Sequence, residues 1–258
     1  MKRIVLKIGS SVLTNYNEIA YDRLSNIIEL VAKLKENDYE VIIVSSGAVS
    51  VGSTILSLDR NILANKQAMA AIGQPLLLSR YQEESAKHGF KSAQILLSSD
   101  IFSSPEKIEQ SQNTIETLLS NNVVPIINEN DSVSVDELIF GDNDMLAAHC
   151  TLHFNAEKLI ILSDVDGLYI DNPKTNKHAK IIMLRDSISE SEISKDKEEN
   201  IGFGTGGIIS KLRAAKFILD NNLIMFLSSG FNLIQVYNYL IDNNNTYGTI
   251  FSKQVSIT

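Results

Sequence analysis

The sequence has few residues of several types, and each shortage excludes a class of protein. A single cysteine, Cys150, among 258 residues excludes both a disulfide framework and a cysteine-based zinc site. Four prolines and 13 glycines exclude a collagen-like or linker-dominated chain. Apolar runs stay well below the ~18 residues that suggest a membrane span. The N-terminal apolar run is interrupted at Lys7, which argues against a signal peptide. We therefore expect a cytoplasmic protein without a membrane segment.

The charge balance is acidic. The formal net charge is −8, which disfavours nucleic-acid and anionic-membrane partners because both need a basic field. A small anionic ligand in a locally positive pocket remains compatible with this charge. Hydrophobic residues make up 44% and charged residues 21%, so a packed core is expected. We expect a single domain over residues 1–258.

Short apolar runs alternate with longer amphipathic segments along the chain. This alternation predicts a three-layer α/β sandwich with a mostly parallel central sheet. Strands are expected at Arg3–Ile8, Glu40–Val44, Phe90–Leu97, Val123–Ile127, Lys158–Leu162, Ile224–Leu227 and Gly248–Phe251. Helices are expected at Tyr21–Asn37, Asn65–Gly89, from Ser103 onward, Asp142–Phe154 and Gly207–Asn221. Gly73-Gln74-Pro75 should break or kink the second helix. Ser187–Asn200 is polar and predicts a solvated lobe or a mobile loop.

Short polar residues follow four of the expected strands. In parallel α/β sheets, ligands bind beyond the C-terminal ends of the strands. Each of these segments alone is compatible with ordinary turn chemistry. Four together favour one shared polar site. The segments are Gly9-Ser10-Ser11, Ser45-Ser46-Gly47-Ala48, Asn128-Glu129-Asn130-Asp131 and Ser163-Asp164-Val165-Asp166-Gly167.

Lys7 is the most informative residue of the sequence, and Lys211 is a second candidate, although a plain turn with a surface lysine is slightly favoured for Lys211 taken alone. Lys7 lies inside an expected buried strand, where its charge is costly unless it meets an anion. The alternative is an edge strand protected by lysine. Lys211 follows Gly204-Thr205-Gly206-Gly207, and glycines before a helix N-terminus suit phosphate binding. The alternative there is a turn with a surface lysine, since a Walker A loop is absent.

Gly141-Asp142-Asn143-Asp144 precedes or opens a helix. Asp and Asn cap helices, but three in a row exceed what capping needs. We expect Asp144 to lie within salt-bridge or one-water reach of Lys7 or Lys211, because a carboxylate would offset the repulsion between them. Further along this helix, His149 is expected to be a packing residue, with a metal site as the weaker alternative.

These motifs together resemble the amino acid kinase family, and its glutamate 5-kinases in particular. Lys7-Ile8-Gly9-Ser10-Ser11 resembles the family's opening K-x-G-[ST]-S motif. Pro125–Asp131 followed by Gly141–Asp144 resembles the glutamate 5-kinase pattern. Gly204–Lys211 resembles the nucleotide loop, with Ile208 and Ser210 replacing the usual methionine and threonine. The chain ends soon after Phe251, so we expect no C-terminal PUA domain.

The resemblance implies transfer of the ATP γ-phosphoryl group to the side-chain carboxylate of L-glutamate, the first step of proline biosynthesis. Lys7 and Lys211 would flank the phosphoryl group, Asp144 would orient them, and the backbone N–H groups of Gly9 and Gly47 would assist. Mg²⁺ would be held by phosphates and water, without a metal site built from protein ligands alone. Proline is expected to inhibit, and a homo-oligomer is expected.

The remaining implied residues divide between the two substrates. The part before about residue 155 would mainly bind glutamate, and the rest would bind nucleotide. The glutamate residues would be Ser46, Gly47, Asn128, Asp131 and Asn143. The nucleotide residues would be Lys7, Gly9, Ser163, Asp164, Thr205, Gly206, Gly207, Ile208, Ile209, Ser210 and Lys211. Alternatives are an N-acetylglutamate or aspartate kinase, or a non-catalytic glutamate or proline sensor.

Overall fold

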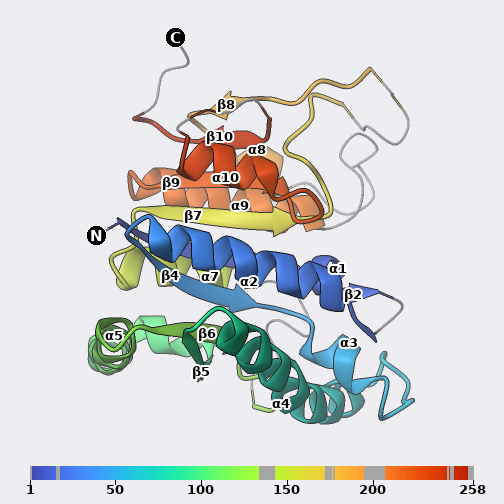
Figure 1. Ribbon diagram of the computed structural model, residues 1–258. Helices are drawn as coiled ribbons and strands as arrows, with labels where there is room; N and C mark the ends of the chain where they lie inside the picture. Colours follow the sequence, from blue (N-terminus) through green and yellow to red (C-terminus); the bar gives the residue numbers. More distant parts are fainter. Residues whose placement is uncertain are drawn as a thin grey trace.

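The centre of the molecule is an eight-stranded sheet (Figure 1). The computed structural model describes residues 2–15, 18–133, 143–171, 176, 178–194, 207–242, 244 and 247–254. The strands lie in the order β5 (Lys91–Leu97), β6 (Val123–Glu129), β4 (Tyr39–Ser45), β1 (Lys2–Ile8), β7 (Lys158–Ser163), β9 (Ile224–Ser229), β10 (Thr249–Phe251) and β8 (Leu184–Arg185). Only β10 and β9 pair antiparallel among the described strands of this sheet. The mostly parallel sheet predicted from the sequence is therefore confirmed.

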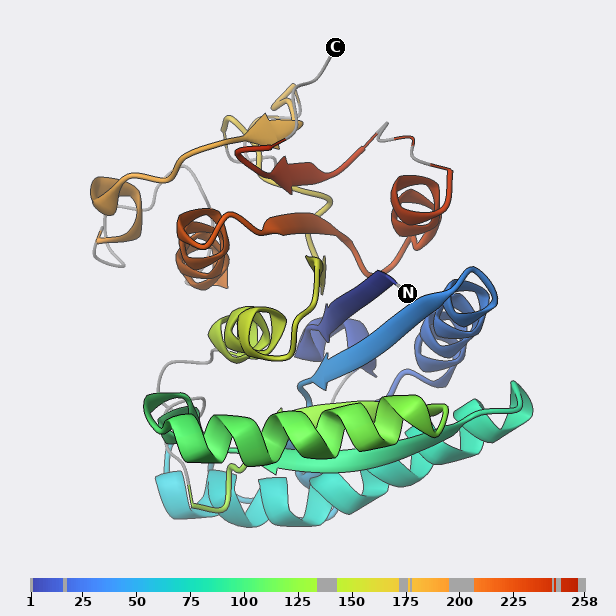
Figure 2. The same cartoon turned by 90° about the vertical axis from the view of Figure 1, so that its left-hand side faces the viewer.

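Helices cover both faces of the sheet (Figure 2). One face packs on α2 (Tyr21–Glu36), α4 (Leu63–Lys87) and α10 (Ile234–Leu240). The other face packs on α5 (Pro105–Ser120), α7 (Asn143–His153) and α9 (Gly207–Asp220). These three layers confirm the predicted sandwich. None of the described helices is long and apolar enough to cross a membrane.

Strand β1 lies in the middle of the sheet, between β4 and β7. Its Ile4, Leu6 and Ile8 belong to the core beneath α2 and α4. Val5 belongs to the opposite core, beneath α7. Because side chains alternate along a strand, Lys7 lies on the same face as Val5. The edge-strand alternative for Lys7 is therefore wrong.

Gly73-Gln74-Pro75 does not break the helix, because α4 runs without interruption from Leu63 to Lys87; the alternative of a kink stays a prediction. A proline inside a helix removes one backbone hydrogen bond. Here the loss is offset by close packing of α4 against α3 (Ala48–Gly52). A Cβ atom added to Gly73 would lie 1.9 Å from the Ala48 carbonyl oxygen, and one added to Gly52 would lie 1.8 Å from that of Met69. The two glycines let the helix backbones touch.

The smaller elements were not predicted. They are α1 (Ser10–Leu13), β2 (Thr14–Asn15), β3 (Glu18–Ile19), α3, a 3-10 turn at Ser99–Ser103, β8, α8 (Glu190–Ile193) and α10. Part of the expected polar lobe, Ser187–Asn200, is an ordered element: Ser189 and Glu192 form a capping box at the start of α8. Ile188 is buried in the core beneath α9. Residues 195–200 lie outside the described residues.

Candidate active site

The C-terminal ends of the central strands meet at one cavity of about 380 Å³. Two backbone hydrogen bonds extend the strand pairing to the edge of this cavity. Ser46 N–H donates to the Ile8 carbonyl (3.2 Å), and Gly9 N–H donates to the Leu162 carbonyl (3.0 Å). The expectation that Gly9 N–H is available to a phosphate is therefore wrong, because the β1–β7 ladder uses it. Gly47, which follows, has φ +107°, a left-handed conformation that favours glycine.

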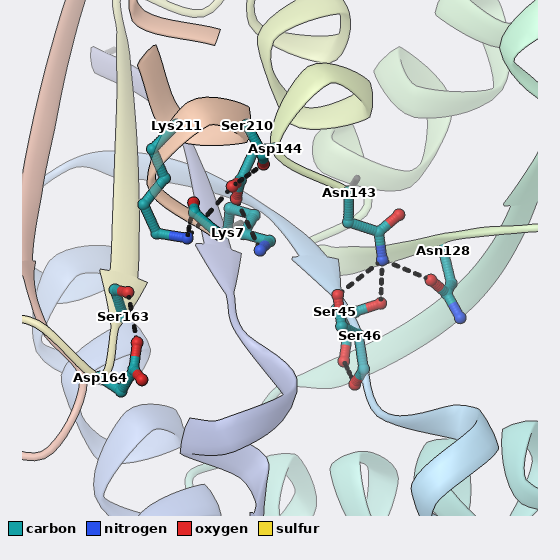
Figure 3. Close-up of polar contacts among 11 residues, drawn as sticks. Lys7, Ser45, Ser46, Asn128, Asn143, Asp144, Ser163, Asp164, Ser210 and Lys211 are labelled. Atoms are coloured by element: carbon teal, nitrogen blue, oxygen red, sulfur yellow. Dashed lines mark hydrogen bonds and ion pairs between the residues drawn. The ribbon is translucent and has the colours of Figure 1, made fainter. Parts of the chain in front are cut away.

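Lys7 and Asp144 form a buried ion pair in the wall of this cavity (Figure 3). Lys7 Nζ lies 2.6 Å from Asp144 Oδ1, and the two side chains are 8% and 2% exposed. Lys7 lies near the C-terminal end of β1, whereas Asp144 lies in the first turn of α7. The cost of burying the lysine is thus offset by a carboxylate brought from a distant part of the chain.

The second oxygen of Asp144 is held by helix α9. Ser210 Oγ donates to Asp144 Oδ2 (2.6 Å), and Lys211 Nζ lies 3.2 Å from the same atom. Lys211 Nζ also donates to the Gly207 carbonyl (3.2 Å). Burial disfavours the charged form of Asp144, but the charges of Lys7 and Lys211 outweigh it and hold the pKa well below its usual range. The prediction that one carboxylate lies within reach of the lysines is confirmed for both.

A chain of buried side-chain amides adjoins the cavity. Asn143 Nδ2 donates to Ser46 Oγ (2.8 Å), Asn128 Oδ1 (2.8 Å) and the Ser45 carbonyl (3.2 Å). Figure 3 shows these contacts converging on one nitrogen. Asn143 Oδ1 is buried and has no hydrogen-bond partner among the described residues. The structure thus brings Ser46, Asn128 and Asn143 together, although only Ser46 lines the cavity itself.

Asp131 provides a second carboxylate to the cavity wall. Asp131 is 7% exposed, and its Oδ1 has no hydrogen-bond partner within the described parts of the chain. Burial, and secondarily the charge of Glu129, raise the pKa of Asp131 to about 7. Among the described residues, Asp131 forms no salt bridge, in contrast to Asp144.

The predicted nucleotide residues are only partly brought together. Ser163, Asp164, Gly207, Ser210 and Lys211 all line the cavity, and Ser163 Oγ donates to Asp164 Oδ1 (3.1 Å). Ile208 instead packs against the core beneath α9, and neither it nor Ile209 lines the cavity. Thr205 and Gly206, like Gly141 and Asp142, lie outside the described residues.

The structure adds two residues that sequence reasoning missed. Lys66 of α4 lines the cavity, and Gln74 of α4 accepts a hydrogen bond from Asn128 Nδ2 (2.8 Å). Both lie on a helix rather than at a strand end, so the strand-end rule could not identify them. The sequence pattern marks Gln74 only as part of a possible helix break.

His149 is a packing residue, as expected. Its ring stacks on Phe102 (centroids 4.8 Å apart) and contacts the ring of Phe217 (4.4 Å). No group of three or more His, Cys, Asp or Glu side chains within the described ranges is arranged to hold a metal ion. Cys150, beside it, is fully buried.

The cavity therefore combines two kinds of charge. At one side, two lysine ammonium groups share a carboxylate and can attract a phosphate chain. Elsewhere in the wall, the buried carboxylate of Asp131, which forms no salt bridge with the described residues, can attract an ammonium group. This combination suits phosphoryl transfer to an amino acid, since both substrates carry charges that need opposite partners.

Comparisons with known proteins agree with this chemistry. The model of the amino acid kinase family matches residues 2–226. A glutamate 5-kinase of Leishmania donovani is 44% identical over 99% of this chain and 97% of its own length. A glutamate 5-kinase of Wolinella succinogenes is 45% identical over 97% of this chain and 98% of its own length. A glutamate 5-kinase of Geobacillus kaustophilus is 41% identical over 99% of this chain and 70% of its own length.

Two solved structures share the fold. Carbamate kinase from Giardia lamblia bound to AMP-PNP has a TM-score of 0.65 and 14% identity, covering 97% of this chain and 98% of its own. UMP kinase from Ureaplasma parvum has a TM-score of 0.63 and 18% identity, covering 98% and 99%. At this identity the likeness bears on the fold alone.

Proposed function

The chain belongs to the amino acid kinase family, and we propose that it transfers the γ-phosphoryl group of ATP to the side-chain carboxylate of L-glutamate, forming glutamate 5-phosphate. The observation that carries this proposal is the pairing of two features in one cavity. These are the Lys7–Asp144–Lys211 cluster and the buried Asp131 oxygen that lacks a partner among the described residues.

The lysine cluster fits the electrostatic demands of phosphoryl transfer. A carboxylate is already a nucleophile, so no general base is required to activate it. The main obstacle is the repulsion between two anions, and positioned positive charge removes it. Asp144 holds Lys7 and Lys211 in fixed positions before substrates arrive, which lowers the reorganisation needed during the reaction. We assign Lys7 and Lys211 as catalytic residues and Asp144 as the residue that positions them.

Asp131 fits the ammonium group of glutamate. Its buried oxygen would gain an ion pair on binding, and Asn143 Oδ1 offers a further buried acceptor. An N-acetylated substrate has no ammonium group, so it would leave Asp131 buried without a cation. Free glutamate is therefore preferred over N-acetylglutamate as the substrate.

The nucleotide side of the cavity suits Mg²⁺ delivered with ATP. Asp164 is exposed there, next to the Ser163 hydroxyl, and among the described residues it forms no ion pair. Mg²⁺ typically takes one or two carboxylates together with phosphates and water. Asp164 would thus be the protein carboxylate that joins the ATP phosphates around the metal. When bound, the ion would neutralise charge on those phosphates.

Under the same proposal, the earlier part of the chain binds glutamate and the later part binds the nucleotide. The strands before about residue 155 contribute Ser46, Asn128 and Asp131 for glutamate, and the later elements contribute Ser163, Asp164 and Gly207 for the nucleotide. Inhibition by proline and assembly into a homo-oligomer are further proposals. Addition of proline to the assay and light scattering of the purified protein test them.

A substrate screen tests the function directly. The protein is incubated with ATP, Mg²⁺ and glutamate, N-acetylglutamate, aspartate or carbamate, and hydroxylamine traps any acyl phosphate as a hydroxamate. We expect hydroxamate with glutamate well above the other acceptors. Turnover confined to another acceptor would refute the assignment, and an absence of turnover with all four would favour the non-catalytic sensor.

A further inference from the structure

Gln74 lies in the middle of α4, beside the glycine at which α4 contacts α3. Gln74 is 7% exposed, and its Oε1 accepts a hydrogen bond from Asn128 Nδ2 (2.8 Å) in the buried interior. The close contact of Gly73 with the Ala48 carbonyl fixes this part of α4 next to the loop that carries Ser46. Gln74 thereby lies at the far end of the amide chain, separated from Ser46 in the cavity wall by Asn128 and Asn143.

The direction of each hydrogen bond in the amide chain, from donor to acceptor, is fixed. One end of the chain is the Ser45 carbonyl, which can only accept, so the nitrogen of Asn143 must face it. The same nitrogen donates to Asn128 Oδ1, which turns Asn128 Nδ2 away from Asn143. That nitrogen then needs an acceptor in a buried position, and Gln74 Oε1 is the acceptor that the structure supplies.

Ser46 connects the amide chain to the cavity. Ser46 Oγ accepts a hydrogen bond from Asn143, so its own proton is left to donate to a group inside the cavity. A carboxylate of the substrate is such a group. The orientation of the Ser46 hydroxyl thus depends on Asn143, whose partner Asn128 is held in turn by Gln74.

We propose that Gln74 is a positioning residue for the amino acid substrate: it fixes Asn128 and Asn143, and through them the Ser46 hydroxyl, without touching the substrate itself. This inference rests on the proposed function, since it presumes that glutamate binds beside Ser46. Without an acceptor at position 74, Asn128 Nδ2 would be buried and unpaired, and Asn128 would rotate away from Asn143 to recover a partner.

The test uses two substitutions that differ in whether an acceptor remains. Gln74→Met keeps the length of the side chain but removes the strong acceptor, whereas Gln74→Glu keeps an acceptor oxygen. We expect Gln74→Met to raise the KM for glutamate by ~10-fold or more, the scale of one buried hydrogen bond left unmade. The KM for ATP should change by less than about twofold, because the amide chain does not reach the nucleotide side. Gln74→Glu should stay much closer to the wild type.

Gln82→Met is the matched control on the same helix. Gln82 is exposed, and its Nε2 donates to the Ser92 carbonyl (3.4 Å), away from the amide chain. It should leave both KM values unchanged. An unchanged glutamate KM in Gln74→Met, or an equal loss in Gln74→Met and Gln74→Glu, would overturn the inference. If Gln74→Met does not fold, a glutamate KM in Gln74→Glu as high as that of an Asn128→Ala variant would overturn it.

The wild-type assay separates this inference from the proposed function. Hydroxamate formation from glutamate by the wild-type protein tests the function on its own. If it fails, the function is wrong whatever Gln74 does. If it succeeds and Gln74→Met behaves as wild type, only the positioning role is wrong.

Discussion

Lys7 Nζ and Asp144 Oδ1, 2.6 Å apart, join the C-terminal end of the first strand to the first turn of a helix that follows much later in the sequence. Both side chains are nearly inaccessible to water. A buried pair of this kind contributes little net stability, but loss of one partner leaves an uncompensated charge. The pair therefore fixes the position of the Lys7 ammonium group, and a mutation of either partner should destabilise the protein.

Asp144→Asn removes the charge that Lys7 and Lys211 share. We expect kcat to fall by ~10²-fold or more, because the lysines repel each other and lose their fixed positions. Stability should fall by ~3–5 kcal/mol, the cost of breaking a buried pair, as measured by urea unfolding. The control is Asp220→Asn at the half-exposed pair with Lys216, where little change is expected. Wild-type turnover in Asp144→Asn would refute the positioning role.

Lys211→Ala tests the electrostatic contribution of the second lysine. Turnover should fall by ~10²-fold or more, the scale for losing one donor to developing charge. Folding should change less than in Asp144→Asn, because Asp144 keeps its contacts with Lys7 and Ser210. Steady-state kinetics and thermal unfolding measure the two effects, with Lys216→Ala on the same helix as the control. A large loss of stability with preserved kcat would contradict the assignment.

The glutamate KM should depend on pH through Asp131. Its pKa is raised to about 7, mainly by burial and further by the charge of Glu129. Below that pH the carboxyl group is protonated and neutral, so the ammonium group of glutamate loses its partner. The KM for glutamate should therefore rise by up to ~10-fold per pH unit as the pH falls below about 7, and level off above it.

Asp131→Asn checks the source of that dependence. The variant should show a glutamate KM raised by ~10-fold or more at pH 8, with the ATP KM nearly unchanged. Its glutamate KM should lose most of the pH dependence seen in the wild type. Equal losses for both substrates would point to a defect in folding instead.

Acid should destabilise the protein through His149. Burial, and secondarily the charge of His153, lower the pKa of His149 from 6.5 to about 4. The folded state thus prefers the neutral ring. This contribution to stability is complete above pH 6.5 and is lost as the pH falls toward 4. Urea unfolding at pH 5 and 7.5 should show a smaller pH effect for His149→Phe than for the wild type. His178→Gln, at an exposed histidine, should behave as the wild type.

The sequence was a good guide where a single strand or helix carried the information. The run Arg3–Ile8 lacks alternation because both faces of β1 are covered, and this also predicted that Lys7 needs an anion. It was a poor guide where contacts between elements decide. Pro75 stays inside α4 because α3 packs against that helix, which no local pattern records. Gly9 N–H is taken by Leu162, a pairing that depends on the order of strands in the sheet.

The candidate site shows the same division. The sequence by itself determined the alternation of strands and helices, the polar strand ends, and the need of Lys7 for a carboxylate, since these follow from periodicity and from the cost of burying charge. The expectation that Asp144 meets a lysine and Asp131 the substrate came from the motifs and the family resemblance. Only the tertiary structure decided the contacts themselves: Lys7 and Lys211 both lie at Asp144, one at each carboxylate oxygen. The helix packing that brings Lys7, Ser210 and Lys211 to Asp144 leaves Oδ1 of Asp131 without such a partner among the described residues, because each lysine can reach only what the layers of the fold place beside it.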